Sequence, residues 1–190
     1  MNKLTYGYAL TGSFCTFERS ISQMKKLKEQ GIDILPVMSY NAYKTDTRFG
    51  KAFDFVKKIE KICDKTVIAS ITEAEPIGPK KMCDILIVLP CTGNTLAKLA
   101  CGIYDTPVTL AVKSHLRNQR PVLIGVSSND SLSSSAKHIG ALLNCKNYYF
   151  IPMLQDDPEK KPFSIVCDFE AVAESAAMAL QGKQIQPIIK

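Results

Sequence analysis

A short run of small and polar side chains, Cys91 to Thr95, lies between a predicted strand and a predicted helix. Five apolar residues at 85–89 indicate the strand, and the proline after them is expected to end it because proline cannot donate a ladder hydrogen bond. Apolar residues at helical spacing over 96–103 indicate the helix. Thr92 or Asn94 can cap this helix, whose free N–H groups attract anions. The pattern is therefore typical of a phosphate site, although an ordinary capped turn has the same residues.

Three other predicted strands, at 4–10, 32–38 and 121–126, also end in short polar loops. The loops are Thr11 to Phe14, Ser39 to Asn41 and Ser127 to Ser131. Gly12 lets a ligand approach the backbone closely, but the three-glycine fingerprint of dinucleotide sites is missing. Because the carboxyl ends of parallel strands meet at one edge of a sheet, the four loops are expected to form one crevice rich in hydrogen-bond donors.

The seven cysteines favour reduced thiols over a disulfide framework. Their number is odd, and no two of them have the C-x-x-C spacing of structural zinc ligands, so we expect no metal site. Cys91 differs from the others because it lies at a predicted helix N-terminus, where thiolate character can rise. The simpler interpretation is that Cys91 is a small packed loop residue.

Charge and hydropathy exclude several classes of partner. The formal charge is +6, from 24 basic and 18 acidic residues, but the aromatic interleaving of single-strand nucleic-acid binders is missing. A basic surface helps to gather a small anionic substrate instead. No run of 18 apolar residues predicts a membrane span, and the N-terminus has the pattern of a first strand, without a signal-peptide cleavage site. We therefore expect a cytoplasmic protein with no nucleic-acid or membrane partner.

Strand and helix patterns alternate along the chain, which predicts a parallel sheet with right-handed crossovers. Strands are expected at 4–10, 32–38, 67–69, 85–89, 121–126 and 148–151, and helices at 17–30, 51–61, 96–103, 107–116, 132–143 and 169–180. Residues 71–81 and 152–158 are expected to be loops, and residues 186–190 a mobile tail. The fold class is therefore α/β: a three-layer Rossmann-like (flavodoxin-like) domain over 1–190, with about six parallel strands and the first near the sheet centre.

The segment after residue 89 also carries a resemblance to a known family. The matching residues are Pro90, Cys91, Thr92, Gly93, Asn94 and Thr95, continued by Ala97, Lys98, Ala100, Gly102, Ile103 and Asp105. They resemble, without a gap, the signature loop of the flavoprotein family, which holds homo-oligomeric cysteine decarboxylases and flavin prenyltransferases. The resemblance implies bound FMN and a trimer, or a dodecamer of trimers, with the flavin pocket between subunits.

The same resemblance assigns the site. Ser39 and Ala42 fit the family's pattern for a serine that binds the flavin phosphate, although a serine-capped turn looks the same. Asn94 matches an asparagine that handles substrate in the decarboxylases, and this resemblance makes it the candidate catalytic residue. The residues expected to hold the cofactor are Gly12, Ser13, Phe14, Ser39, Asn41, Pro90, Cys91, Thr92, Gly93, Asn94, Thr95, Ser127 and Asn129.

The substrate loops of both known branches are replaced. The decarboxylases present a catalytic histidine within the segment equivalent to 71–81, but the two histidines here are His115 and His138. Of the decarboxylase proline-alanine-methionine-asparagine motif only Asn129 could correspond, and the prenyltransferase arginine–glutamate pair is missing. Glu73 and Glu75 could act as acid or base, but solvated glutamates are the commoner case.

Over its whole length the chain is similar to one further branch of the family. That branch works beside a second subunit that carries a nicotinamide-binding domain, NAD(P), and it acts on a small dicarboxylate. If the reaction oxidises that substrate by removing two electrons and a proton, it needs an acceptor such as a nicotinamide or a flavin. The resemblance implies an oxidoreductase subunit. The alternatives are a scaffold subunit with a vestigial flavin site, or a flavin-dependent decarboxylase or prenyl-transfer enzyme.

Overall fold

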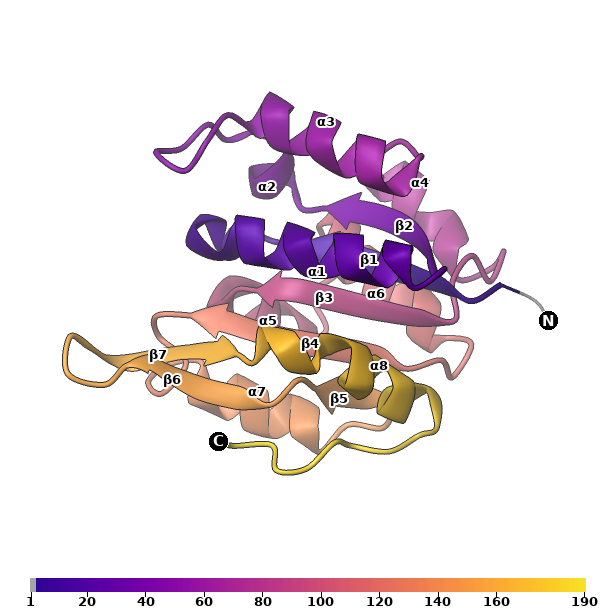
Figure 1. Cartoon of the computed structure of the whole chain (residues 1–190). Coiled ribbons are helices and arrows are strands. Elements are labelled where there is room, and N and C mark those ends of the chain that lie inside the picture. Colours follow the sequence, from indigo (N-terminus) through magenta and orange to yellow (C-terminus); the bar gives the residue numbers. More distant parts are fainter. Residues whose placement is uncertain (1–2) are drawn as a thin grey trace.

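A computed structural model describes residues 3–190 as a mixed sheet covered by helices (Figure 1). The strands are β1 (Thr5–Leu10), β2 (Asp33–Met38), β3 (Ile85–Cys91), β4 (Val122–Ser128), β5 (Tyr148–Phe150), β6 (Met153–Asp157) and β7 (Lys161–Cys167). The helices are α1 (Phe17–Glu29), α2 (Tyr40–Lys44), α3 (Ala52–Cys63), α4 (Ile71–Ala74), α5 (Gly93–Ala100), α6 (Pro107–Leu116), α7 (Ala136–Leu143) and α8 (Val172–Leu180), with 3-10 turns η1 (Phe14–Thr16), η2 (Glu75–Ile77) and η3 (Phe169–Ala171).

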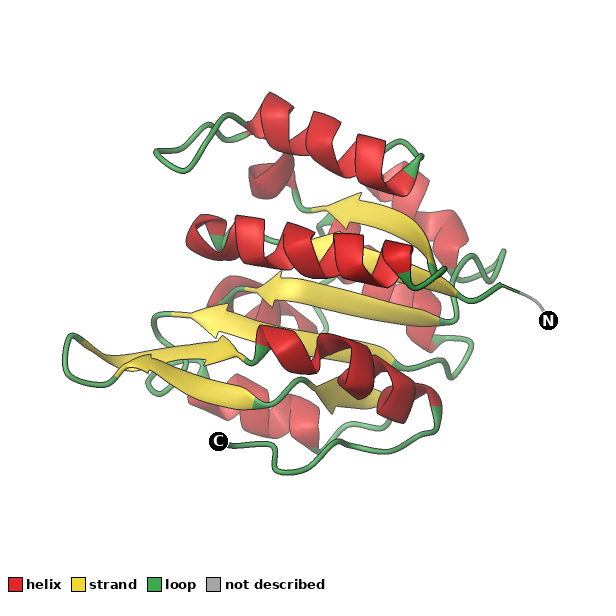
Figure 2. Cartoon of the chain, in the orientation of Figure 1, coloured by secondary structure: helices red, strands yellow, loops and turns green. Residues whose placement is uncertain are grey.

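The sheet confirms the expected α/β fold class. Strands β2, β1, β3, β4 and β5 are parallel in that order, which is the flavodoxin-like order. The outer edge of β4 is shared, because residues 122–124 pair with β5 and residues 127–128 pair antiparallel with β7. The β6–β7 hairpin therefore extends the sheet beyond the short β5 and brings the total to seven strands (Figure 2).

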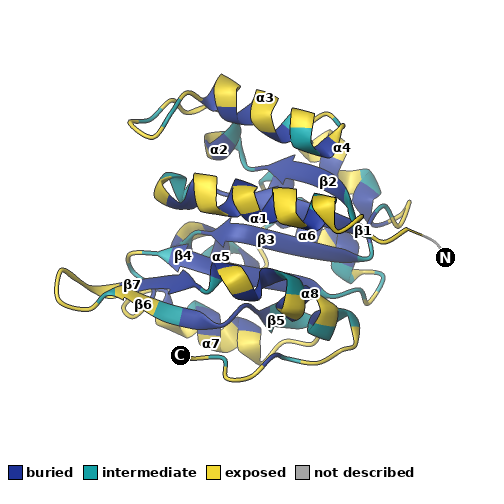
Figure 3. Cartoon of the chain, viewed as in Figure 1, coloured by how far each residue is buried: buried dark blue, intermediate teal, exposed yellow. Residues whose placement is uncertain are grey.

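Two layers of helices bury both faces of the parallel strands. Helices α1, α3 and α8 contribute to the apolar cluster on one face, and α5, α6 and α7 to the cluster on the other. Every residue of β3 is buried, as parallel strands covered on both sides require (Figure 3). Among the helices of residues 3–190, none combines the length and the apolar character needed to cross a lipid bilayer.

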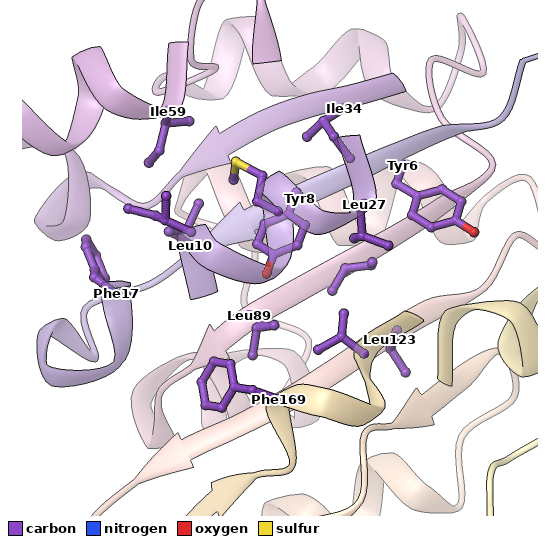
Figure 4. Close-up of a cluster of buried hydrophobic side chains, with 14 of the residues drawn as sticks. Tyr6, Tyr8, Leu10, Phe17, Leu27, Ile34, Ile59, Leu89, Leu123 and Phe169 are labelled. Carbon is purple, nitrogen blue, oxygen red and sulfur yellow. The ribbon is translucent and has the colours of Figure 1, made fainter. Parts of the chain in front are cut away.

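The cluster under α1 fixes the start of that helix against the sheet (Figure 4). The Tyr8 ring is fully buried, and its hydroxyl donates to the Ser20 carbonyl at 2.9 Å. The Ser20 hydroxyl in turn donates to the Leu89 carbonyl at 2.7 Å. Buried polar groups that are satisfied in this way hold a specific geometry. Helix α1 is thereby bonded to both β1 and β3.

Several predicted boundaries are wrong. Pro90 does not end its strand: β3 continues to Cys91, with a shift of register between Val88 and Cys91 opposite β4. Residues 71–77 are helical, because the Ser70 hydroxyl caps α4 and Glu73 bonds back to the Ser70 N–H at 3.0 Å, a capping box. The expected strand at 67–69 makes only a single bridge to β2 in the described chain.

The region after residue 127 differs most from expectation. The helix predicted from 132 begins at Ala136, because serine residues before it wrap around Asp130. Residues 152–158, expected to be a loop, contain strand β6 and the start of its turn, and residues 161–167, for which no strand was predicted, form β7. The tail is held in place: the Met153 N–H donates to the Ile188 carbonyl at 2.8 Å, and the Lys190 N–H donates to the Met153 carbonyl at 3.0 Å.

His115 couples this fold to pH. The ring is buried, its Nε2–H donates to the Pro121 carbonyl at 3.1 Å, and its Nδ1 lies 3.5 Å from the Cys83 sulfur. Burial lowers the pKa of His115 from its ordinary 6.5 to about 4, because the charged ring would lose its water. Between these two pH values the His115 ring therefore stays neutral in the native state but is protonated in the unfolded chain.

We expect the free energy of unfolding to fall as pH drops from about 6.5 to about 4, since only the unfolded state gains the proton in that window. The loss should reach about 2–3 kcal/mol at the acid end. Urea unfolding of wild type and H115Q between pH 7 and 4 measures it, with H138Q as the matched histidine control. Equal pH dependence in wild type and H115Q would contradict the assignment.

Candidate functional site

A cleft of about 880 Å³ lies at the carboxyl edge of β1, β3 and β4. Its floor is formed by the loops after these strands, at 12–16, 92–94 and 127–130. Two further segments complete the wall: the α2–α3 loop through Arg48 and Phe49, and the β6–β7 hairpin. In Figure 1 both segments extend past the carboxyl ends of β3 and β4, on the left of the view. The topology thus places the cleft where open α/β sheets bind ligands.

Thr11 joins the loops after β1 and β3. Its hydroxyl donates to the Pro90 carbonyl at 2.7 Å, and its N–H donates to the same oxygen at 3.2 Å. The hydroxyl also accepts from the Thr92 N–H at 3.0 Å. Because Thr11 is almost fully buried, these bonds are shielded from water. The start of the signature loop is therefore fixed before any ligand arrives.

Ser13 joins the loops after β1 and β4. Its hydroxyl lies 2.9 Å from the Ser127 hydroxyl, and the Thr16 hydroxyl lies 3.2 Å from the same Ser127 oxygen. The Thr16 hydroxyl also donates to the Ser13 carbonyl at 2.9 Å. Three hydroxyl groups from two loops thus share one small network. The network gives the cleft floor rotatable donors whose positions are set by the backbone.

Helix α5 points its N-terminus at the cleft. Thr92 is its N-cap, and the Thr92 hydroxyl accepts from the Thr95 N–H at 3.3 Å. The N–H groups of Gly93 and Asn94 belong to the first turn and have no carbonyl partner within the helix. Gly93 is buried, whereas the Asn94 side chain is exposed at the cleft. This is the donor arrangement expected for an anion site.

The Asp130 carboxylate lies on one side of this N-terminus. A methyl group added to Gly93 would be 2.4 Å from Asp130 Oδ1, so only glycine fits there. The hydroxyl groups of Ser134 and Ser135 donate to Asp130 at 2.8 and 3.0 Å, and Ser128 donates to its other oxygen. The Ser128 bond, ahead of the others, lowers the pKa of Asp130. The chain's own negative charge therefore lies beside the α5 N-terminus, on the Gly93 side.

The cleft brings most of the expected residues together. Those that line it are Gly12, Ser13, Phe14, Thr92, Gly93, Asn94, Ser127 and Asn129. Ser39 caps α2 by accepting from the Ala42 N–H at 3.3 Å and does not line the cleft. Asn41 is exposed nearby, 4.0 Å from where a Cβ on Gly12 would lie. Pro90 and Thr95 are buried outside the lining, and the Thr95 hydroxyl lies 3.1 Å from that of Thr92.

Cys91 is a packed residue, and the thiolate interpretation is wrong. Its side chain is completely buried within β3, one residue before the helix cap. Burial raises the pKa of the Cys91 thiol far above its ordinary value, because the thiolate would have no water around it. The helix N-terminus cannot offset that cost, since the sulfur lies in the apolar cluster under α5 and α6. Cys91 thus stabilises the strand and does not act as a nucleophile.

Sequence reasoning missed the charged part of the wall. The additional lining residues are Cys15, Thr16, Arg19, Arg48, Phe49, Ser128, Asp130, Asp156, Lys161, Ser164, Ile165 and Val166. The hairpin has only a partial signal in the sequence: apolar residues at 163, 165 and 166 follow a polar turn, but Lys161 and Pro162 interrupt the strand pattern. No local pattern places Arg48 at the cleft, because its position depends on how the α2–α3 loop folds.

Comparison with known proteins agrees with this architecture. The B subunit of dipicolinate synthase from Bacillus subtilis (strain 168) is 42% identical over 183 residues, which are 96% of this chain and 92% of that protein. The crystal structure of the corresponding dipicolinate synthase B chain from Bacillus halodurans C has a TM-score of 0.90 at 39% identity, covering 100% of this chain and 98% of that one.

A more distant solved structure shares the fold alone. A dodecameric FMN-dependent Ubix-like decarboxylase from Escherichia coli O157:H7 has a TM-score of 0.65 at 20% identity, covering 78% of this chain and 80% of that one. The family model described as Flavoprotein matches residues 1–185, which include every strand and helix described above. The chain belongs to the Flavoprotein family.

Proposed function

We propose that this chain acts as the flavin-binding B subunit of a dipicolinate synthase, an oxidoreductase. It works with an A subunit that binds NAD(P), in the cytoplasm of the mother cell of a sporulating bacterium, and makes dipicolinate from a dihydrodipicolinate-level precursor. Near-full-length similarity to two proteins of that name supports the assignment. The observation that carries the site is the cleft in which three strand ends are bonded to one another and present donors to an anion.

FMN fits the residues that line the cleft. Gly12 lines the cleft, and an added Cβ would make only ordinary contacts, 3.6 Å from the Phe14 ring and 4.0 Å from the Asn41 Cβ, so the backbone is not covered by other main chain. Gly12 and Ser13 on one side and the first turn of α5 at Asn94 on the other supply N–H and hydroxyl donors for the phosphate. Asn41 lies beside Gly12 and can add an amide donor, whereas Ser39 caps α2 outside the lining. The volume is in the range of small-molecule sites.

The chain's own contribution is binding and orientation. FMN held in this cleft would supply an acceptor for the two electrons that aromatisation releases. Asn94 offers a donor and an acceptor at the mouth of the α5 turn and can orient the ring that reacts. The serine hydroxyls that donate to Asp130 lower its pKa, so the carboxylate stays ionised and is a poor proton donor or acceptor. Acid–base work therefore falls to the substrate, to water or to the partner subunit.

The same cleft is also compatible with the alternative in which this subunit is a non-catalytic scaffold. Within the described cleft the two carboxylates, Asp130 and Asp156, are each bonded to neighbours, and the two histidines lie outside the lining. A protein with this site could hold a ligand without reacting. Flavin dependence of the two-subunit reaction separates the alternatives.

A homo-oligomer is part of the proposal. Exposed apolar side chains occur at two places: Phe49, in the cleft lining, is 44% exposed, and Phe163 and Leu132, joined by a backbone hydrogen bond of 2.9 Å, are 53% and 46% exposed. Such residues become buried when subunits meet. The dodecameric state of the decarboxylase with the same fold supports a homo-oligomer, for which the proposal is a trimer or a dodecamer.

Replacing Gly12 with leucine should weaken FMN binding more than tenfold, because the new side chain projects into the cleft without meeting a backbone atom. Ser13→Ala should cost about 1–3 kcal/mol of binding, since a half-buried hydrogen-bond donor is lost. Fluorescence titration with FMN measures both. The matched control is Gly140→Leu in α7, which adds the same side chain where an added Cβ meets nothing within 4 Å. Wild-type failure to bind FMN, or unchanged binding by Gly12→Leu, would refute the site.

Dipicolinate formation should require both subunits and FMN. The assay compares each subunit alone, the pair after removal of flavin, and the pair with FMN added back. We expect product only from the last, and none when the B subunit carries Gly12→Leu. Full activity of the flavin-free pair would favour the scaffold alternative.

A further inference from the structure

The cleft contains two positive charges that no carboxylate neutralises. Five charged side chains line it: Arg19, Arg48, Asp130, Asp156 and Lys161. Lys161 is paired with Asp156 at 2.6 Å, so this ion pair is nearly neutral as a unit. The Asp130 charge is dispersed over three serine hydroxyls. In residues 3–190, neither Arg19 nor Arg48 forms an ion pair with an acidic side chain.

Each of these guanidinium groups is instead held on an aromatic ring. Arg19 Cζ lies 4.3 Å from the centroid of the Phe169 ring, which is only 2% exposed. Arg48 Cζ lies 4.9 Å from the centroid of the Phe49 ring in the α2–α3 loop. Stacking restrains a guanidinium while it leaves the N–H fork at its edge free to donate. Both arginines line the cleft, and stacking partly sets the orientation of each guanidinium.

We propose that Arg19 and Arg48 form the recognition site for the two carboxylates of a small dicarboxylate. This inference rests on the proposed function, and it identifies the residues that select its substrate. The charges match, because two free guanidinium groups face a ligand that carries two negative charges. The arginine fork matches a carboxylate in shape, since two parallel N–H···O bonds form with one group. Phe49 and Phe14 add apolar surface for a flat ring.

The flavin phosphate is the competing anion for these arginines. Backbone N–H groups and hydroxyls after β1 and at the start of α5 already form a phosphate site that needs no arginine. Arg48 and Arg19 come from other segments, the α2–α3 loop and the second turn of the 14–29 helical stretch. On this proposal the cleft holds two anions, the cofactor phosphate at the strand-end donors and the substrate carboxylates at the arginines.

Calorimetric titration with pyridine-2,6-dicarboxylate and pyridine-2-carboxylate, with FMN present and absent, tests the inference. We expect R48Q and R19Q each to weaken binding of the dicarboxylate about fivefold to tenfold. The monocarboxylate should lose affinity in at most one of the two variants. R48K should recover only part of the loss, because an ammonium lacks the fork. The matched control is R117Q, which removes the same charge from an exposed arginine at the far end of α6.

The outcomes separate this inference from the proposed function. If wild type does not bind the dicarboxylate, or if R48Q and R19Q bind it as R117Q does, the inference is overturned whatever the flavin result. If R48Q and R19Q weaken FMN but leave riboflavin unchanged, the arginines bind the flavin phosphate and the inference is again overturned. Loss of FMN binding by Gly12→Leu with unchanged dicarboxylate affinity would support two separate anion sites.

Discussion

The cleft depends on one buried hydroxyl. Thr11 lies at the end of β1, and its side chain bonds to the Pro90 carbonyl and the Thr92 N–H at the end of β3, with 79 positions separating Thr11 from Pro90 in the sequence. These bonds hold the signature loop in the orientation that points α5 at the cleft. A buried hydroxyl that lost one of these partners would leave a polar group unsatisfied, which costs about 1–3 kcal/mol. Separating the ends of β1 and β3 would therefore carry a free-energy cost.

The rest of the cleft is built outward from that bond. Ser13, Thr16 and Ser127 join the β1 and β4 loops, and the serines around Asp130 hold the next loop against α5. These contacts make a floor of fixed donors. The α2–α3 loop and the hairpin then add the charged and aromatic wall. Fixed donors favour binding, because few side chains lose conformational freedom when an anion binds and the entropy cost is small.

Much of the fold could be predicted because its signals are local. The apolar runs that form β1, β3 and β4, and the proline at the start of α6, specify buried strands and a helix start without help from the rest of the chain. The capping box at Ser70 and Glu73 was also a local signal, and it was overlooked. The β6–β7 hairpin was missed because lysine, proline and acidic residues around its turn obscure the strand pattern.

Some residues of the candidate site could likewise be predicted from local sequence, and others could not. The polar loops after β1, β3 and β4 follow from strand ends and were found, whereas the burial of Cys91 depends on helices packed over its strand. Arg19 and Arg48 were missed because their place at the cleft is a tertiary property. Thr11 was read only as a turn residue, since its partners depend on the register between β1 and β3.

A crystal structure of the protein saturated with FMN tests the central claim most directly. We predict phosphate density between the Gly12–Ser13 backbone and the first turn of α5 at Asn94, with the Thr11 bonds to Pro90 and Thr92 unchanged. Flavin bound at another surface, or a flavin phosphate held by Arg48 and Arg19 with the strand-end loops empty, would contradict it.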